Sequence, residues 1–351
     1  MQELVKKQLS NIPKICNDDY QLLKLRVKEF AIMREISEEE QKRLSEELFV
    51  VKKYGLSKLF LLYQNVPFMF ANYTGVECCS YINYLVRVTD VNPVKYNLPF
   101  ERFFNWKKRS LPSFTLHVKK NFMEHFILEL YERFGEDHLY RPCDNPNAYY
   151  ISAEPFEEKY IQESIETDEN DVRNRYGSIC KFTENQLIQL GYYGFNVLED
   201  EDMEVSDDNS KIEQEQDDWL DIEEIEMCNI NSSKQEQDVF KKAKEMYPNL
   251  PAEQFLEMQE VKEILAETDY RLIFQEQLME ILHKVCGMSK AYADYYRLEI
   301  GKRKRAILSR IRKKLVQKYG EEGIKLFEYI EKYSQYTICK SYVLANMDLN
   351  N

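Results

Sequence analysis

Apolar residues recur at helical spacing through most of the first 140 residues. The run that follows Ser37 contains a capping box, in which Ser37 is the N-cap and the Glu40 side chain reaches back to it. This run predicts a helix that ends near Gly55, because glycine is the usual residue just beyond a helix C-terminus. The same spacing predicts further helices over residues 19–34, 57–63, 78–86, 100–104 and 122–134.

Residues 113–118 follow a different pattern, because apolar and polar residues alternate there. Phe114, Leu116 and Val118 fall on one face of a predicted strand, and Ser113, Thr115 and His117 fall on the other. In a phosphoryl-transfer enzyme built on such a strand, the polar positions would be aspartates that bind divalent metal.

The residues on this polar face are poor ligands for a magnesium pair. Magnesium prefers carboxylate oxygens, whereas Thr115 offers a neutral hydroxyl and His117 an imidazole that suits zinc, copper or iron. The sequence therefore predicts no metal here. A new metal site built on His117 and Glu77 is the less favoured alternative, since a lone histidine on a strand is more often a hydrogen-bonded polar residue.

Beyond residue 140 the pattern changes twice. Residues 141–235 show few apolar periods, and they predict a small folded remnant over 148–198 followed by a partly disordered linker over 199–235. Helices dominate after residue 238, with boundaries at Gly287, Gly301 and Gly320. They are expected at residues 252–267, 269–285, 289–300, 303–319 and 321–333.

Charge divides the chain into acidic and basic parts. The net charge is −13, but residues 199–226 hold fifteen acids and one lysine, whereas residues 302–318 hold nine Lys and Arg residues and no acid. Ile307, Ile311 and Leu315 form an apolar stripe in the basic run, so its cations are expected to face outward. Such a face either binds nucleic-acid phosphates or is simply solvated.

Composition excludes several classes of protein. No apolar run approaches the length of about 20 residues needed to span a bilayer, and no signal-peptide pattern occurs, so a cytoplasmic location without membrane contact is expected. The eight cysteines contain no C-x-x-C pair and are expected to be reduced thiols. The chain also lacks a P-loop and a nucleophile elbow, which disfavours a P-loop NTPase and a serine hydrolase.

Two groups of motifs occur far apart in the chain. The first, within residues 89–105, reads T-D-V-N-P, K-Y-N-L and F-E-R-F-F-N. The second comprises F-Q-E-Q-L-M at 274–279, A-D-Y-Y-R-L-E-I-G-K-R-K at 293–304, I-E-K-Y at 330–333 and K-S-Y at 340–342. Together they resemble the palm and fingers of the alpha subunit of bacterial DNA polymerase III, over residues 38–140 and 250–345.

This resemblance implies an α+β protein that is predominantly helical, with a small palm-like mixed sheet followed by a helical, fingers-like lobe. The implied domains are a helical lead-in (1–36), a degenerate palm (37–140), a reduced thumb or palm remnant (141–198), an acidic linker (199–235) and a fingers-like domain (236–351). The phosphoesterase and clamp-binding modules typical of the family are expected to be absent from this chain.

The departures from the family pattern fall on the chemistry. The two catalytic aspartates align with Thr115 and His117, and Asp221 is a weak candidate for a third acid. In the loop that holds triphosphate in the family, only Gly75 and Ser80 keep their identities, and Glu77 adds a negative charge.

The resemblance also implies contacts with nucleotide and DNA. The expected nucleotide contacts are Gly75, Ser80, Arg297, Lys302 and Lys340. The expected DNA contacts are Arg303, Lys304, Arg305, Arg310, Arg312, Lys313 and Lys314.

Three functions follow as hypotheses. The favoured one is a catalytically inactive relative that needs no cofactor and binds DNA or a replication or repair protein. The second is a minimal, magnesium-dependent DNA polymerase whose carboxylates come from Asp221, Glu77 or another chain. The third is an interaction protein that no longer contacts nucleic acid.

Overall fold

A computed structural model describes residues 2–65, 71–155, 160, 178–200 and 258–348. The chain divides into two compact units, which are described separately. The N-terminal unit comprises Met1–Asn97 and Lys108–Asp217, and the C-terminal unit comprises Leu98–Lys107 and Asp218–Asn351. The segment Leu98–Lys107, which the sequence analysis includes in the palm, thus packs with the C-terminal helices.

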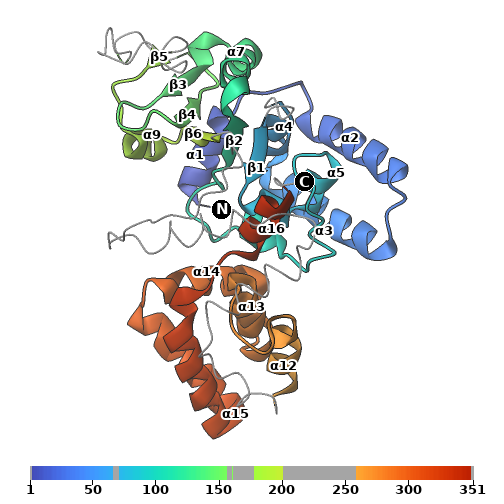
Figure 1. The fold of residues 1–351 in the computed structure, drawn as a ribbon, viewed down its shortest axis with the longest axis vertical. Coiled ribbons are helices and arrows are strands. Elements are labelled where there is room, and N and C mark those ends of the chain that lie inside the picture. The colour runs from blue at the N-terminus through green and yellow to red at the C-terminus, as the bar shows by residue number, and fades with distance from the viewer. Residues whose placement is uncertain (1, 66–70, 156–159, 161–177, 201–257, 349–351) are drawn as a thin grey trace, which may run out of the picture. The chain divides into compact units, whose positions relative to one another are not determined.

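The N-terminal unit begins with helices α1 (Glu3–Asn11), α2 (Asp19–Met33), α3 (Glu38–Tyr54) and α4 (Ser57–Asn65). The predicted capping box is confirmed, because the Glu40 N–H donates to Ser37 and the Ser37 N–H donates to the Glu40 carboxylate. Gly55 ends α3 with a φ of 69°, a left-handed conformation that glycine adopts without strain. Helices α2, α3 and α4 gather with the short α5 (Tyr81–Leu85) in one helical group (Figure 1).

A six-stranded mixed sheet forms the rest of this unit, in the order β1-β2-β6-β4-β3-β5. Its strands are β1 (Ala71–Thr74), β2 (Thr115–Lys119), β3 (Leu139–Arg141), β4 (Ala148–Ile151), β5 (Ser178–Ile179) and β6 (Tyr193–Asp200). β2 pairs antiparallel with β1 and parallel with β6. The remnant predicted over residues 148–198 therefore supplies β4, β5 and most of β6. Strand β6 lies directly beside β2, which carries Thr115 and His117.

Aromatic packing holds the buried side of this sheet. Phe114 stacks on Phe195 with ring centroids 4.7 Å apart, and Tyr149 lies 5.9 Å from Phe195 on the next strand. Phe114, Leu116 and Val118 are all buried, which confirms the predicted alternation in this segment. Helix α7 (Met123–Phe134) packs against β2, and α9 (Glu184–Leu190) packs against β6 (Figure 1).

The C-terminal unit is helical. Its elements are α6 (Phe100–Phe103), α12 (Gln259–Leu265), α13 (Gln275–Glu280) with the π-turn η9 (Ile281–Val285), α14 (Lys290–Gly301), α15 (Arg305–Tyr333) and α16 (Lys340–Asp348). Helix α14 packs against both α13 and α15 (Figure 1). Within the part of the chain that the structure describes, no helix is long and apolar enough to cross a membrane.

Two helix boundaries in this unit test the sequence analysis. Gly320 has φ 57° and ψ −126° inside α15, so the predicted boundary there is confirmed as a sharp interruption of one helical element. The helix predicted from residue 269 instead begins at Gln275. The prediction is wrong because Asp269 and Tyr270 have left-handed φ angles of 48° and 62° and form a turn.

A buried network of charged side chains joins the helices of this unit. The Arg102 guanidinium on α6 lies 3.2 Å from the Glu276 carboxylate on α13 and 3.7 Å from the Asp294 carboxylate on α14. Arg102 also donates to the Cys339 sulfur at 2.7 Å, and the Lys340 backbone N–H donates to Glu276 at 2.9 Å. A single guanidinium therefore connects α6, α13, α14 and the start of α16.

Replacing Arg102 with methionine keeps much of the side-chain volume but leaves the Glu276 and Asp294 carboxylates without their shared cation. Removing one partner of a buried ion pair typically costs about 3–5 kcal/mol. We expect the Arg102→Met variant to lose about that much free energy of unfolding, measured by urea denaturation followed by circular dichroism. Arg312→Met, on an exposed position of α15, is the matched control and should change stability by less than about 0.5 kcal/mol. Equal stability of the two variants would contradict this role of Arg102.

Candidate functional site

The polar face of β2 is bordered by residues of two neighbouring strands. Thr115 and His117 are half-buried, as expected for the side of the strand that faces away from the core. In the register of the sheet, Thr74 of β1 and Asn196 of β6 pair with Thr115. Asn72 of β1 and Leu198 of β6 pair with His117.

Asn196 is the site residue that the sequence analysis missed. A third metal ligand on this sheet would have to stand close to Thr115, and the β6 residue in that register is an amide. The sequence does carry a signal for strand β6, because Tyr193, Phe195 and Val197 are apolar or aromatic at alternate positions. All three side chains are buried in the structure. The candidate third acid, Asp221, lies outside the described residues.

The side chains on this face do not fit a pair of magnesium ions. A hydroxyl, an imidazole and an amide stand where such a pair needs carboxylates to anchor it. Among the described residues, no group of three or more His, Cys, Asp or Glu side chains is placed to hold a metal ion. Asp200 is an acid that follows Asn196 and Leu198 at alternate positions of β6. It pairs with Lys119, at the opposite end of β2 from Thr115.

The predicted triphosphate loop is occupied by contacts within the protein. Ser80 is the N-cap of α5, and its hydroxyl donates to the Glu47 carboxylate at 2.8 Å. The backbone N–H groups of Tyr81 and Ile82 donate to the same carboxylate at 2.9 and 3.1 Å. Arg43 also lies 2.6 Å from it. Because Glu47 takes the donors that a phosphate would use, this helix end is not open to an anion in the structure.

Glu77 lies in the same loop and is fully buried. Neither of its carboxyl oxygens has a hydrogen-bond partner among the described residues. Burial raises the pKa of Glu77 to about 8, and the residue's own backbone N–H and the charge of Lys108 oppose this shift only in part. Burial therefore disfavours the charged form of Glu77, which opposes the negative charge that the sequence analysis expects in this loop.

Two of the three cations expected to contact nucleotide in the fingers are paired with protein groups: Arg297, which is half-buried, and Lys340, which is buried. Arg297 donates to the Asp294 carboxylate at 3.0 Å and to the Gln275 side-chain oxygen at 2.8 Å. The Lys340 ammonium donates to Glu267 at 2.6 Å and is almost fully buried. Lys302 is exposed. The structure thus places Lys340 in the folded interior, Arg297 in a half-buried position and Lys302 on the surface.

The basic run of α15 has the predicted two-sided character. Ile307, Ile311 and Leu315 are buried, and the cations predicted to contact DNA are exposed. Within the described residues, Lys304 is the only one of these seven cations that forms an ion pair with an acid, so Arg305, Arg310, Arg312 and Lys313 have no acidic partner. Lys304 pairs with Glu299, and Lys314 donates to the Cys286 carbonyl at 3.2 Å.

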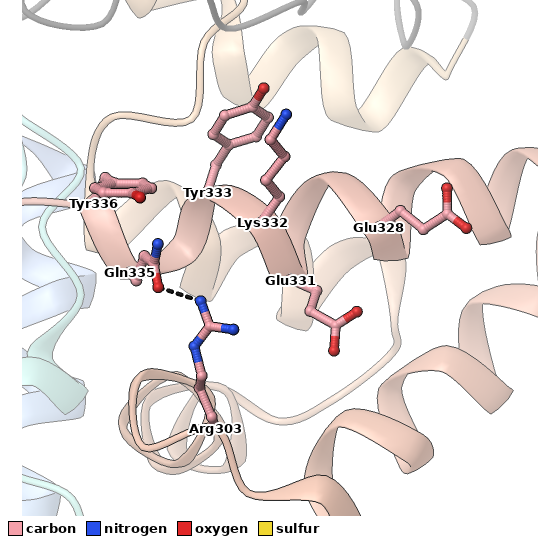
Figure 2. A pocket seen from close by; sticks show the side chains of 7 residues that line it. All are labelled: Arg303, Glu328, Glu331, Lys332, Tyr333, Gln335 and Tyr336. Carbon is pink, nitrogen blue, oxygen red and sulfur yellow. Dashed lines mark hydrogen bonds between the residues drawn. The ribbon is translucent and has the colours of Figure 1, made fainter.

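Arg303 lies apart from this exposed face, in an open hollow of about 560 Å³ (Figure 2). Its guanidinium donates to the Gln335 side chain, and the other charged residues that line the hollow are Lys332, Glu328 and Glu331. Two cations and two acids give this hollow no net charge. It therefore has no electrostatic preference for a phosphate group.

The raised pKa of Glu77 predicts how stability depends on pH. The folded protein keeps a proton that the unfolded chain releases between the ordinary value of 4.5 and the folded value of about 8. This contribution to stability is fully present below pH 4.5 and is lost as pH rises through about 8, at up to about 1.4 kcal/mol per pH unit. Glu77→Gln should remove this dependence and be the more stable protein at pH 8.

Urea denaturation at pH 5, 6.5 and 8 measures the difference between Glu77→Gln and wild type. Glu29→Gln, an exposed position on α2, is the control and should follow the wild-type pH dependence. If the gap between Glu77→Gln and wild type stays constant from pH 5 to pH 8, Glu77 does not carry a raised pKa.

Two family models match this chain. One is described as the bacterial DNA polymerase III alpha NTPase domain and matches residues 15–144. The other is described as the bacterial DNA polymerase III alpha subunit finger domain and matches residues 231–323. The first match contains the motifs at 89–105, and the second contains the motifs at 274–279 and 293–304.

Curated relatives agree with these matches. The DNA polymerase III subunit alpha of Ureaplasma parvum is 31% identical over 104 residues, which are 28% of this chain and 11% of the relative. The same subunit of Halalkalibacterium halodurans is 30% identical over 112 residues, covering 30% of this chain and 10% of the relative. An error-prone DNA polymerase of Symbiobacterium thermophilum is 27% identical over 115 residues, covering 31% and 10%.

The aligned region therefore spans about a tenth of the length of each of these relatives. Models for two different domains of one polymerase subunit match separate parts of the chain, in agreement with the motifs at 89–105 and 274–304. This protein is a relative of the bacterial DNA polymerase III alpha subunit.

Proposed function

We propose that this protein binds DNA through the exposed cations of α15, transfers no nucleotides, and acts in DNA replication or repair. The observation that carries the proposal is the set of side chains at the polar face of β2: Thr115, His117 and Asn196. Two-metal nucleotidyl transfer needs carboxylates to hold the ions that stabilise the attacking and leaving oxygens. None of these three side chains is a carboxylate.

The residues that keep the family pattern support the same proposal. Arg102, Glu276 and Asp294 belong to the F-E-R-F, Q-E-Q and A-D motifs, and all three are buried in the ionic network of the C-terminal unit. Their contacts, as described above, hold helices together and leave the charges satisfied. The chain thus keeps the family's packing residues but has other residues at the positions of its metal ligands. We expect this combination when a fold is retained for binding rather than for catalysis.

The charge of α15 supports DNA as the ligand. Lys302 to Lys318 contains nine cations and no acid, and Arg305, Arg310, Arg312 and Lys313 are exposed on it. Cations that neutralise phosphates release counterions, so the resulting affinity is strongly dependent on salt. A replication or repair protein bound to the same surface is the partner that the family relationship suggests.

A primer-extension assay tests the absence of nucleotide transfer. With a primed template, all four deoxynucleotides and either magnesium or manganese, we expect no extension of the primer, because the β2 face lacks carboxylates. Extension that is abolished in the Asp221→Ala variant would overturn the proposal and assign the protein as a minimal polymerase. Wild type mixed with an active polymerase controls for inhibitors in the preparation.

A gel shift at several salt concentrations tests DNA binding. The double variant Arg312→Glu, Lys313→Glu should weaken binding at least about tenfold and lower the slope of log affinity against log salt by about two. The double variant Lys24→Glu, Lys28→Glu makes the same change of charge at exposed positions of α2 and should bind as wild type. If wild type does not shift DNA even at low salt, the protein acts through protein contacts alone and DNA binding is refuted.

A further inference from the structure

Two large aromatic side chains are exposed side by side on the C-terminal unit. Trp106 is 39% exposed and Tyr292 is 40% exposed, and their rings meet edge to face with centroids 6.1 Å apart. The Lys107 ammonium lies 4.3 Å from the centroid of Trp106 and 4.5 Å from that of Tyr292. The two ring planes are nearly perpendicular, at 89°, and the cation over both rings adds positive charge to this exposed aromatic pair.

Hydrogen bonds of Asn105 fix this arrangement. Its side-chain amide donates to the Ala291 carbonyl at 2.8 Å, and its side-chain oxygen accepts from the Lys107 backbone N–H at 2.8 Å. Asn105 itself is buried and also donates to Asp294 at 3.2 Å. The turn that carries Trp106 is therefore tied to the first turn of α14, so little order has to be gained when a ligand binds.

The aromatic surface continues toward the basic face of α15. Tyr296 lies one helical turn beyond Tyr292, with ring centroids 6.2 Å apart. Helix α14, which carries Tyr296, packs against α15, and interaction with the Tyr296 hydroxyl raises the pKa of the exposed Arg310 guanidinium on that helix. Trp106, Tyr292 and Tyr296 thus form a row of contacting aromatic rings, and α14, which carries the two tyrosines, packs against the basic helix α15.

We propose that Trp106 and Tyr292 form a base-stacking platform for single-stranded nucleic acid, and that the cations of α15 hold the adjoining phosphates. This inference rests on the proposed DNA binding and specifies the ligand. Stacking requires unpaired bases, because a duplex hides the faces of its bases between neighbouring pairs. Exposed aromatic rings beside a row of cations are the combination by which proteins bind single strands without sequence preference.

Affinity measurements with single-stranded and duplex DNA test the platform. Trp106→Leu and Tyr292→Leu should each weaken binding of the full-length protein to oligodeoxythymidine of about 20 nucleotides by roughly 5- to 100-fold. Both changes keep the charge, so the salt dependence should stay as in wild type, and duplex affinity should change little. Tyr336→Leu is the matched control, because Tyr336 is 51% exposed on the same unit but lines the neutral hollow.

Intrinsic fluorescence provides a second readout that does not depend on the leucine variants folding normally. The chain has two tryptophans, so Trp219→Phe leaves Trp106 as the sole tryptophan reporter. Oligodeoxythymidine should quench this emission, whereas polyglutamate should not. Equal quenching by polyglutamate would assign the surface to an acidic protein partner and overturn the platform.

The outcomes separate the platform from the proposed function. If Trp106→Leu and Tyr292→Leu bind the oligonucleotide as wild type while Arg312→Glu, Lys313→Glu does not, DNA binding stands and the platform is refuted. If wild type binds neither single-stranded nor duplex DNA, both proposals fall together.

Discussion

The burial of Arg102 is the constraint on which the C-terminal unit depends. A guanidinium taken out of water is costly unless its partners are placed around it, and here Glu276, Asp294 and the Cys339 sulfur provide them. Each partner comes from a different segment, so the charge is satisfied in only one arrangement of those segments. The persistence of these residues in the family pattern therefore has a structural explanation that requires no nucleotide chemistry.

In the N-terminal unit, the packing of the sheet does not depend on the residues of its polar face. Successive residues of β2 point to opposite faces, so the packing of Phe114, Leu116 and Val118 is independent of what stands at positions 115 and 117. Clustered carboxylates repel one another unless metal ions separate them, and their replacement removes that repulsion. The Glu47 carboxylate that caps α5 holds the neighbouring loop through contacts within the protein.

The sequence predicts those features that local rules determine. Ser37 and Gly55 mark the ends of α3, Gly320 marks the break in α15, and alternation identifies β2. These local rules do not predict contacts between residues that are far apart in the sequence. Glu47 reaches Ser80 across 33 residues and Arg102 reaches Glu276 across 174, and nothing near either residue in sequence specifies its partner. The same holds for Asn196, whose place beside Thr115 follows from the pairing of β6 with β2.

Asn105 connects the interior of the C-terminal unit to its surface. One amide group contacts both Asp294, which belongs to the Arg102 network, and Ala291, beside the exposed Tyr292. The position of Trp106 is thus set by the same buried charges that hold the helices together. A surface built on a rigid ionic core keeps its shape without a ligand, so the proposed platform would lose little conformational entropy when it binds.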